Sequence, residues 1–349
     1  MSQHGADSSP AEPALPPDGI DPDASDFVYD EFAWFSENCA EYDLPWEGSA
    51  QVERIDVPVG DTGNVSMLRW GSGHPEVVFL HGGAQNAHTW DTVALAMGQP
   101  AALAVDLPGH GRSLWRGDGR YDPHSNAEAV LEALRDMLGH PVLLVGMSLG
   151  GLTANRVAAE APELVHRLVV VDVTPGVTRD KAKEVHDFIA GPQTFASFGE
   201  RFARTMEFNP TRSATSLRRG ILHNAHRLED GSWQWNYHRA LPGRPEDAGH
   251  EFAGGDADGS EDSEPAGDTS VFPDRELLWA DVESTTMPYL LARGADSPVV
   301  DDADVAELLR RRPDARVELV ASAGHSIQGD QPLVLAAMLE AELELASAD

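Results

Sequence analysis

The sequence has 349 residues, 41% of them hydrophobic, so it is long enough for one large α/β domain with insertions or for two ordinary domains. Its 58 Asp and Glu residues outnumber its 25 Lys and Arg residues and give a formal net charge of −33. A charge of this sign argues against nucleic acid as a partner, because binding to phosphates needs a basic face. Because the sequence has no run of about 18 apolar residues, we expect no membrane-spanning helix.

The N-terminal residues 1–25 are polar, Pro-rich and acidic and lack the pattern of a secretory signal, so we expect a disordered tail. The single cysteine, Cys39, excludes an internal disulfide framework and favours a reducing, cytoplasmic location. Lysine occurs only at Lys181 and Lys183, while acidic residues are spread along the whole chain. This composition resembles that of proteins from high-salt cytoplasms and favours a halophilic source, because salt screens self-repulsion.

The pattern after the tail predicts an α/β fold. Residues 27–42 are expected to form an amphipathic helix, and VERIDVPV and NVSMLRW two antiparallel strands. From residue 76 onward, short β-branched runs alternate with helix-length segments, which predicts a parallel sheet buried on both faces. Ligands of such sheets bind beyond the carboxyl ends of the strands. The expected strands are 76–80, 101–106, 141–146, 167–173, 288–293 and 315–321, and the expected helices are 126–138, 149–160, 301–311 and 332–346.

The alternation stops between about residues 174 and 286, where no pattern continues the sheet. Three helical patterns (180–190, 195–207 and 214–226) and an aromatic-rich stretch fall in this gap. We interpret 176–285 as a cap domain inserted into a core formed by 26–175 and 286–349. Within the cap, the acidic, Gly-rich stretch 245–270 predicts a disordered, solvated loop. Its Asp-x-Asp spacing does not meet the EF-hand pattern, so no calcium site is expected.

The strongest motif is Gly146-Met147-Ser148-Leu149-Gly150, which follows an apolar strand and precedes a helix-length segment. A sharp turn between a strand and a helix is the setting of a nucleophilic serine. Only very small neighbours at positions 146 and 150 let the chain turn sharply enough for Ser148 to project from the sheet. The N-terminus of the following helix favours negative charge that develops beside the serine.

Other motifs lie at neighbouring strand ends. His81-Gly82-Gly83 follows a strand, and we expect the backbone amides of Gly83 and Leu149 to bind a substrate oxyanion. His81 and His110 are interpreted as structural hydrogen-bonding residues. His325 occupies a loop of small residues after the last strand and is the best placed of the 14 histidines to act as a base.

Taken together, the motifs HGG, DLPGHGRS, GMSLGG and AGHS, in this order, resemble those of the α/β-hydrolase superfamily. The resemblance covers about residues 50–175 and 285–347. It implies a mostly parallel, eight-stranded, doubly wound sheet with a cap inserted after strand six. It also implies that Ser148 is the nucleophile and His325 the base. In this superfamily, an aspartate as the nucleophile would imply an epoxide hydrolase or a haloalkane dehalogenase. The serine at position 148 argues against both.

The third member of the implied catalytic triad has two candidates. In most of the superfamily the acid follows strand seven in a G-x-x-D turn, but here Ser297 occupies that place and Asp296 lies one residue earlier. Other members place the acid at the end of strand six, where this chain has Asp172. A carboxylate at an otherwise apolar strand end must be paired or functional. We favour Asp172 and retain Asp296 as the alternative. The segment resembles certain small bacterial esterases, which combine a VD-x-x-P sequence at strand six with a G-x-x-S-P sequence at strand seven, as this chain does.

These residues predict a serine hydrolase that cleaves a small ester, thioester or lactone and needs no metal or organic cofactor. Trp233, Trp235 and Tyr237 alternate along the chain, so they could line the substrate pocket or pack the cap onto the sheet. Within the same fold, a carbon–carbon bond hydrolase or an acyltransferase remains open. From another class, a non-catalytic binding protein remains open as well. The sequence does not indicate the oligomeric state.

Overall fold

A computed structural model describes residues 20–61, 63–209, 212–238 and 274–348. The main sheet consists of eight strands: β1 (Val52–Val59), β2 (Gly63–Trp70), β3 (Val77–Leu80), β4 (Ala102–Val105), β5 (Val142–Met147), β6 (Val165–Val171), β10 (Tyr289–Gly294) and β11 (Arg316–Val320). Their spatial order is β1-β2-β4-β3-β5-β6-β10-β11. β2 pairs antiparallel with β1 and β4, and every other neighbouring pair is parallel. The expected mostly parallel, eight-stranded sheet is confirmed.

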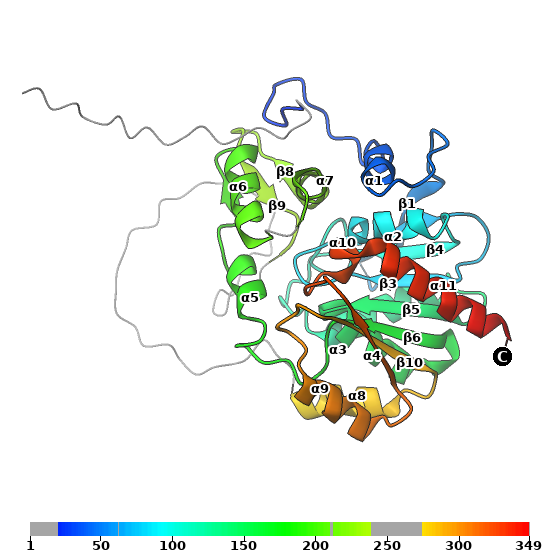
Figure 1. Ribbon diagram of the computed structural model, residues 1–349. Helices are drawn as coiled ribbons and strands as arrows, with labels where there is room; N and C mark the ends of the chain where they lie inside the picture. The colour runs from blue at the N-terminus through cyan, green and yellow to red at the C-terminus, as the bar shows by residue number, and fades with distance from the viewer. Residues whose placement is uncertain (1–19, 62, 210–211, 239–273, 349) are drawn as a thin grey trace, which may run out of the picture.

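Helices cover both faces of this sheet (Figure 1). The hydrophobic cluster on one face includes residues of α3 (Pro123–Arg135), α4 (Leu149–Glu160), α8 (Arg275–Ser284) and α9 (Asp302–Arg311). The cluster on the other face includes residues of α1 (Phe35–Glu41), α2 (Asp91–Ala96) and α11 (Pro332–Ala348). Strands β3, β4 and β5 are buried along their whole length, because side chains on both faces pack under helices. Three short helices complete this part of the fold: η1 (Ala87–Trp90), η2 (Pro162–Leu164) and α10 (Ile327–Asp330).

A separate group of elements follows β6. It contains α5 (Lys183–Ile189), α6 (Phe198–Phe208) and α7 (Ala214–Asn224), together with a small sheet of β7 (Thr194–Phe195), β9 (Trp233–Trp235) and β8 (Ala225–Arg227). Both strand pairs of the small sheet are antiparallel. Its apolar side chains form a third hydrophobic cluster, and Figure 1 shows the group in green beside the main sheet. We call this group the cap.

Helix α8 lies within the range 176–285 that was predicted to form the cap. Its residues Leu278, Trp279 and Val282 are buried in the same cluster as residues of α4, on one face of the main sheet. The division of the chain into core and cap stays a prediction. These contacts show that α8 packs on the core and not on the cap.

The N-terminal prediction was wrong in part. Only Phe35–Glu41 of the expected helix 27–42 is helical. The residues before it form turns, in which the Asp30 carboxylate accepts a hydrogen bond from the Phe32 amide. Glu31 is instead held by an ion pair with Arg54 from β1. Tertiary contacts of this kind outweigh helix propensity, which is weak for the aromatic and β-branched residues at the start of the segment.

Two predicted disordered segments lie mainly outside the described residues. These are the tail up to residue 19 and the acidic loop 245–270. The last part of the predicted tail, residues 20–25, is ordered: Asp23 accepts hydrogen bonds from the Phe198 amide and from Trp233 Nε1, so it packs on the cap. In the part of the chain that the structure describes, no helix is long and apolar enough to cross a membrane.

Candidate active site

Ser148 lies in the sharp turn between β5 and α4. Its backbone φ of +51° is strained for a residue with a side chain, and such strain is typical of functional sites. A Cβ atom on Gly146 would lie 2.3 Å from the Gly150 carbonyl oxygen, and one on Gly150 would lie 2.3 Å from the Leu80 carbonyl oxygen. The turn therefore requires glycine at both positions, as the sequence motif predicted.

The structure brings Ser148, His325 and Asp172 together in one hydrogen-bonded chain. His325, in the loop between β11 and α10, has its Nε2 3.0 Å from Ser148 Oγ. Its other ring nitrogen, Nδ1, lies 2.8 Å from Asp172 Oδ2. Asp172 follows β6, is completely buried and also has a positive φ of +51°. This arrangement allows a proton to pass from the serine to the imidazole while the carboxylate holds the ring.

The surroundings of Asp172 explain why Ser297 occupies the position after β10. Ser297 Oγ donates a hydrogen bond of 2.5 Å to Asp172 Oδ2, and the Gly294 amide donates one of 2.9 Å to Oδ1. A carboxylate at position 297 would instead place a second negative charge beside Asp172. Asp296, the alternative candidate, is exposed, and its amide is bonded to the Ala323 carbonyl. The structure places Asp172, and not Asp296, in contact with His325.

The two expected oxyanion donors lie at the ends of β3 and β5. Leu149 is the first residue of α4, so its amide has no partner within the helix. Gly83 lies in a loop whose neighbouring amides are held in place: the Gly82 amide donates to Gln85 Oε1, and the Ala84 amide donates to His110 Nε2. A loop fixed on both sides of Gly83 suits a preorganised oxyanion donor.

His81 and His110 are structural, as interpreted from the sequence. Nε2 of His81 accepts a hydrogen bond from the Leu107 amide, and Nε2 of His110 accepts the one from Ala84. Burial lowers the pKa of both rings, and that of His110 falls to about 3. Each ring is therefore neutral near pH 7 and acts as a fixed hydrogen-bond partner.

Ser148 and His325 line a pocket of about 1320 Å³, a volume that includes its open mouth. One wall of the pocket comes from α5 of the cap through Val185, Phe188 and Ile189. Sequence reasoning did not identify these three residues. Their spacing of i, i+3 and i+4 was a usable signal, because it places them on one face of a helix.

Of the two roles considered for Trp233, Trp235 and Tyr237, the structure favours packing over lining the pocket around Ser148. Trp233, Trp235 and Tyr237 do not line the pocket around Ser148 and are almost completely buried in the cap cluster. Trp235 stacks on Tyr237 and lies under the guanidinium of Arg201, 4.0 Å from the ring centroid. Packing within the cap therefore accounts for Trp233. Trp235 also lines a neighbouring cavity, and Tyr237 also packs on the core, where its ring stacks on that of His110.

Comparisons with known proteins identify the family of this chain. The model of the alpha/beta hydrolase family matches residues 77–338. The chain is 42% identical over 322 residues to the esterase Rv0045c of Mycobacterium tuberculosis, which covers 90% of this chain and 96% of the relative. It is 26% identical over 271 residues to the sn-1-specific diacylglycerol lipase ABHD11 of Mus musculus, which covers 74% of this chain and 77% of the relative.

Solved structures give the same result. One structure of the M. tuberculosis esterase, from work on its transition metal inhibition and structural refinement, has a TM-score of 0.73 and 40% identity and covers 91% of this chain and 100% of that chain. An E-2-(acetamidomethylene)succinate hydrolase is similar in fold, with a TM-score of 0.67 at 21% identity over 84% of this chain and 100% of that chain. From the family match and the extent of similarity to the esterase, this chain belongs to the alpha/beta hydrolase family.

Proposed function

We propose that this protein is a serine hydrolase that cleaves a carboxylic ester through an acyl-enzyme on Ser148. The observation that carries the proposal is the hydrogen-bonded chain from Ser148 through His325 to the buried Asp172. The similarity to an esterase along most of both chains supports the same reaction class. The mostly apolar helix face of α5 above Ser148 supports a substrate with an apolar part.

In the proposed reaction, Ser148 Oγ attacks the ester carbonyl carbon while His325 Nε2 takes the hydroxyl proton. The amides of Gly83 and Leu149 donate hydrogen bonds to the oxyanion of the tetrahedral intermediate. His325 then protonates the leaving alcohol, and the acyl group stays on Ser148. A water molecule, deprotonated by the same ring, releases the acid and restores the serine. Asp172 holds the tautomer that carries the proton on Nδ1 and stabilises the imidazolium.

A substitution at Ser148 tests the proposal. We expect Ser148→Ala to abolish hydrolysis of a panel of short- and medium-chain esters, thioesters and lactones and to abolish labelling by a fluorophosphonate probe. Ser284→Ala, which removes an exposed serine of α8, is the matched control and should leave both unchanged. Labelling that survives Ser148→Ala would contradict the mechanism. Turnover of none of the panel by labelled enzyme would favour a carbon–carbon bond hydrolase or an acyltransferase, and no labelling at all would favour a non-catalytic binding protein.

We also propose that the protein works in concentrated salt and in the cytoplasm, on a small-molecule substrate and without nucleic acid as a partner. The net charge of −33 supports the role of salt and argues against a polyanionic partner. The buried, single Cys39 supports a reducing compartment. The mechanism uses no metal and no organic cofactor.

A further inference from the structure

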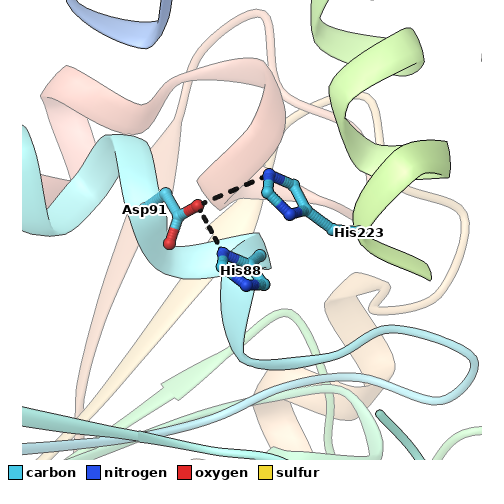
Figure 2. Close-up of side chains that lie close together, drawn as sticks. All are labelled: His88, Asp91 and His223. Carbon is cyan, nitrogen blue, oxygen red and sulfur yellow. Dashed lines mark hydrogen bonds and ion pairs between the residues drawn. The ribbon is translucent and has the colours of Figure 1, made fainter. Parts of the chain in front are cut away.

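A second group of polar side chains lies where the cap meets the core. His88 belongs to η1, Asp91 begins α2, and His223 lies near the end of the cap helix α7. Asp91 Oδ2 is 2.8 Å from His88 Nδ1 and 3.9 Å from His223 Nε2. Both dashed lines in Figure 2 end at this oxygen, and the three ligand atoms lie within 4.8 Å of one another.

We infer that His88, Asp91 and His223 form a binding site for a divalent transition-metal ion such as Zn²⁺, which bridges the cap and the core. Two imidazoles and one carboxylate are a common protein ligand set for zinc and leave a fourth position for water. Bonds of about 2.0–2.1 Å in tetrahedral geometry separate ligand atoms by roughly 3.3 Å. This spacing lies between the two distances from Asp91 Oδ2, and all three ligand atoms lie within 4.8 Å of one another, so ligand movements of about 1–2 Å are sufficient.

The outer nitrogens of both imidazoles already have partners. Nε2 of His88 is 3.0 Å from Glu31 Oε1, and Nδ1 of His223 is 2.7 Å from the Tyr29 hydroxyl. Histidines that bind metals typically use one nitrogen for the ion and hold the other in this way, which fixes the tautomer and the ring orientation. Each ring is thus positioned with its remaining nitrogen toward Asp91.

Asp91 has an unused ligand atom. Its carboxylate is almost completely buried, and Oδ1 accepts no hydrogen bond from the described residues. A buried carboxylate oxygen without a partner is costly, and a metal ion would satisfy it. Binding has two costs in turn. The two imidazoles are stacked at a centroid distance of 3.8 Å and must tilt to point at one ion, and the ion must displace any proton shared between His88 and Asp91.

The three ligand residues face a second cavity, which is open to solvent. All three ligand residues line a neighbouring cavity of about 940 Å³, a volume that includes open solvent at its mouth. This cavity shares Gln85 and Phe188 with the pocket around Ser148. An ion can therefore reach the three ligand residues through the mouth of this cavity.

The residues beside His223 connect the site to the expected oxyanion loop. Asn224 Nδ2 donates a hydrogen bond of 2.6 Å to the carbonyl of Ala84, the residue after Gly83. Asn86 Nδ2 donates one of 2.9 Å to the His223 carbonyl. Movement of His223 toward an ion would therefore displace the loop that carries Gly83. We expect an occupied site to lower ester turnover, and this consequence rests on the proposed function, whereas the binding site itself does not.

Calorimetric titration of the full chain with Zn²⁺ tests the site. Molar KCl and excess Mg²⁺ in the buffer occupy surface carboxylates, whereas imidazole ligands select Zn²⁺ over Mg²⁺. We expect one saturable Zn²⁺ ion per chain. Tyr29→Phe, which removes one hydroxyl behind His223, should weaken binding by about 10- to 100-fold. His223→Gln should weaken it at least as much.

His140→Ala is the matched control, because it removes one imidazole from the exposed pair of His74 and His140, whose ring centroids are 6.0 Å apart. The His140→Ala variant should bind Zn²⁺ with the same affinity as the unsubstituted protein. Absence of a saturable site, an affinity unchanged by both Tyr29→Phe and His223→Gln in folded protein, or loss of binding in His140→Ala would overturn the inference. Since binding is measured without substrate, these outcomes are independent of whether the protein is an esterase. If saturating Zn²⁺ left ester turnover unchanged, the proposed connection from the metal site through Asn224 to the loop of Gly83 would be overturned.

Discussion

Replacing Asp172 by Asn changes one atom of the side chain, and the structure predicts the orientation of the new amide. The Gly294 amide can only donate, so it requires an oxygen at the position of Oδ1, 2.9 Å away. The asparagine NH₂ group must then occupy the position of Oδ2, which faces His325 Nδ1 at 2.8 Å and Ser297 Oγ. In this orientation the amide donates to Nδ1 and forces the proton of His325 onto Nε2.

A His325 ring with its proton on Nε2 cannot accept the proton of Ser148. The equivalent change in a serine protease lowers turnover by about 10⁴-fold, which corresponds to roughly 5.5 kcal/mol of transition-state stabilisation. We expect Asp172→Asn to lower kcat for an ester substrate by about 10³- to 10⁴-fold, with little change in KM. The assay is steady-state hydrolysis in molar KCl, with circular dichroism to verify that the variant is folded.

Asp296→Asn is the matched control for this prediction. Asp296 lines the same pocket as Ser148, but its side chain is exposed and forms no hydrogen bond with His325 in the described part of the chain. Its substitution should therefore change kcat by no more than about a few-fold. A large loss with Asp296→Asn, together with a small loss with Asp172→Asn, would refute the reasoning and make Asp296 the catalytic acid.

The sharp turn at Ser148, the buried His110 and the net charge each affect the stability of the fold. Gly150→Ala should destabilise the fold by about 1–3 kcal/mol or more, measured by urea unfolding, because its Cβ would lie 2.3 Å from the Leu80 carbonyl oxygen. Burial lowers the pKa of His110 from 6.5 to about 3, so the unfolded state binds a proton that the folded state does not. The free energy of unfolding should therefore decrease as the pH falls below about 6.5, with a shallower slope in His110→Gln. Raising KCl from about 0.1 M to molar concentration should raise Tm, because salt screens the net charge of −33, and an unchanged or lower Tm would count against the halophilic interpretation.

The sequence identified the parts of the fold and site that depend on local pattern. The strand before Ser148 and the helix after it follow from an apolar run, a glycine-flanked serine and a helical segment, and the structure has β5 and α4 at these positions. The position of Asp172 was recognisable for a similar reason, because a carboxylate at the end of an apolar strand is costly unless it is paired. Its contacts with Gly294 and Ser297 provide this pairing.

Features that depend on contacts between distant segments were not predictable from the sequence. Glu31 lies in a segment with a helical pattern, yet it forms an ion pair with Arg54, and no local signal indicates that contact. The alternation of Trp233 and Trp235 shows that they share one face of a strand, but not whether this face points toward the substrate or into the cap. The site of His88 and His223 joins residues that are far apart in the sequence, so only the folded chain reveals it.

The central claim is that Ser148 becomes acylated during turnover. Rapid acid quenching of the enzyme with a slowly hydrolysed ester, followed by mass spectrometry of the proteolytic peptides, tests it directly. We predict that the mass of the acyl group appears on the peptide containing Ser148 and disappears as hydrolysis is completed. Ester hydrolysis without an acylated peptide, or with the acyl group on another residue, would contradict the mechanism.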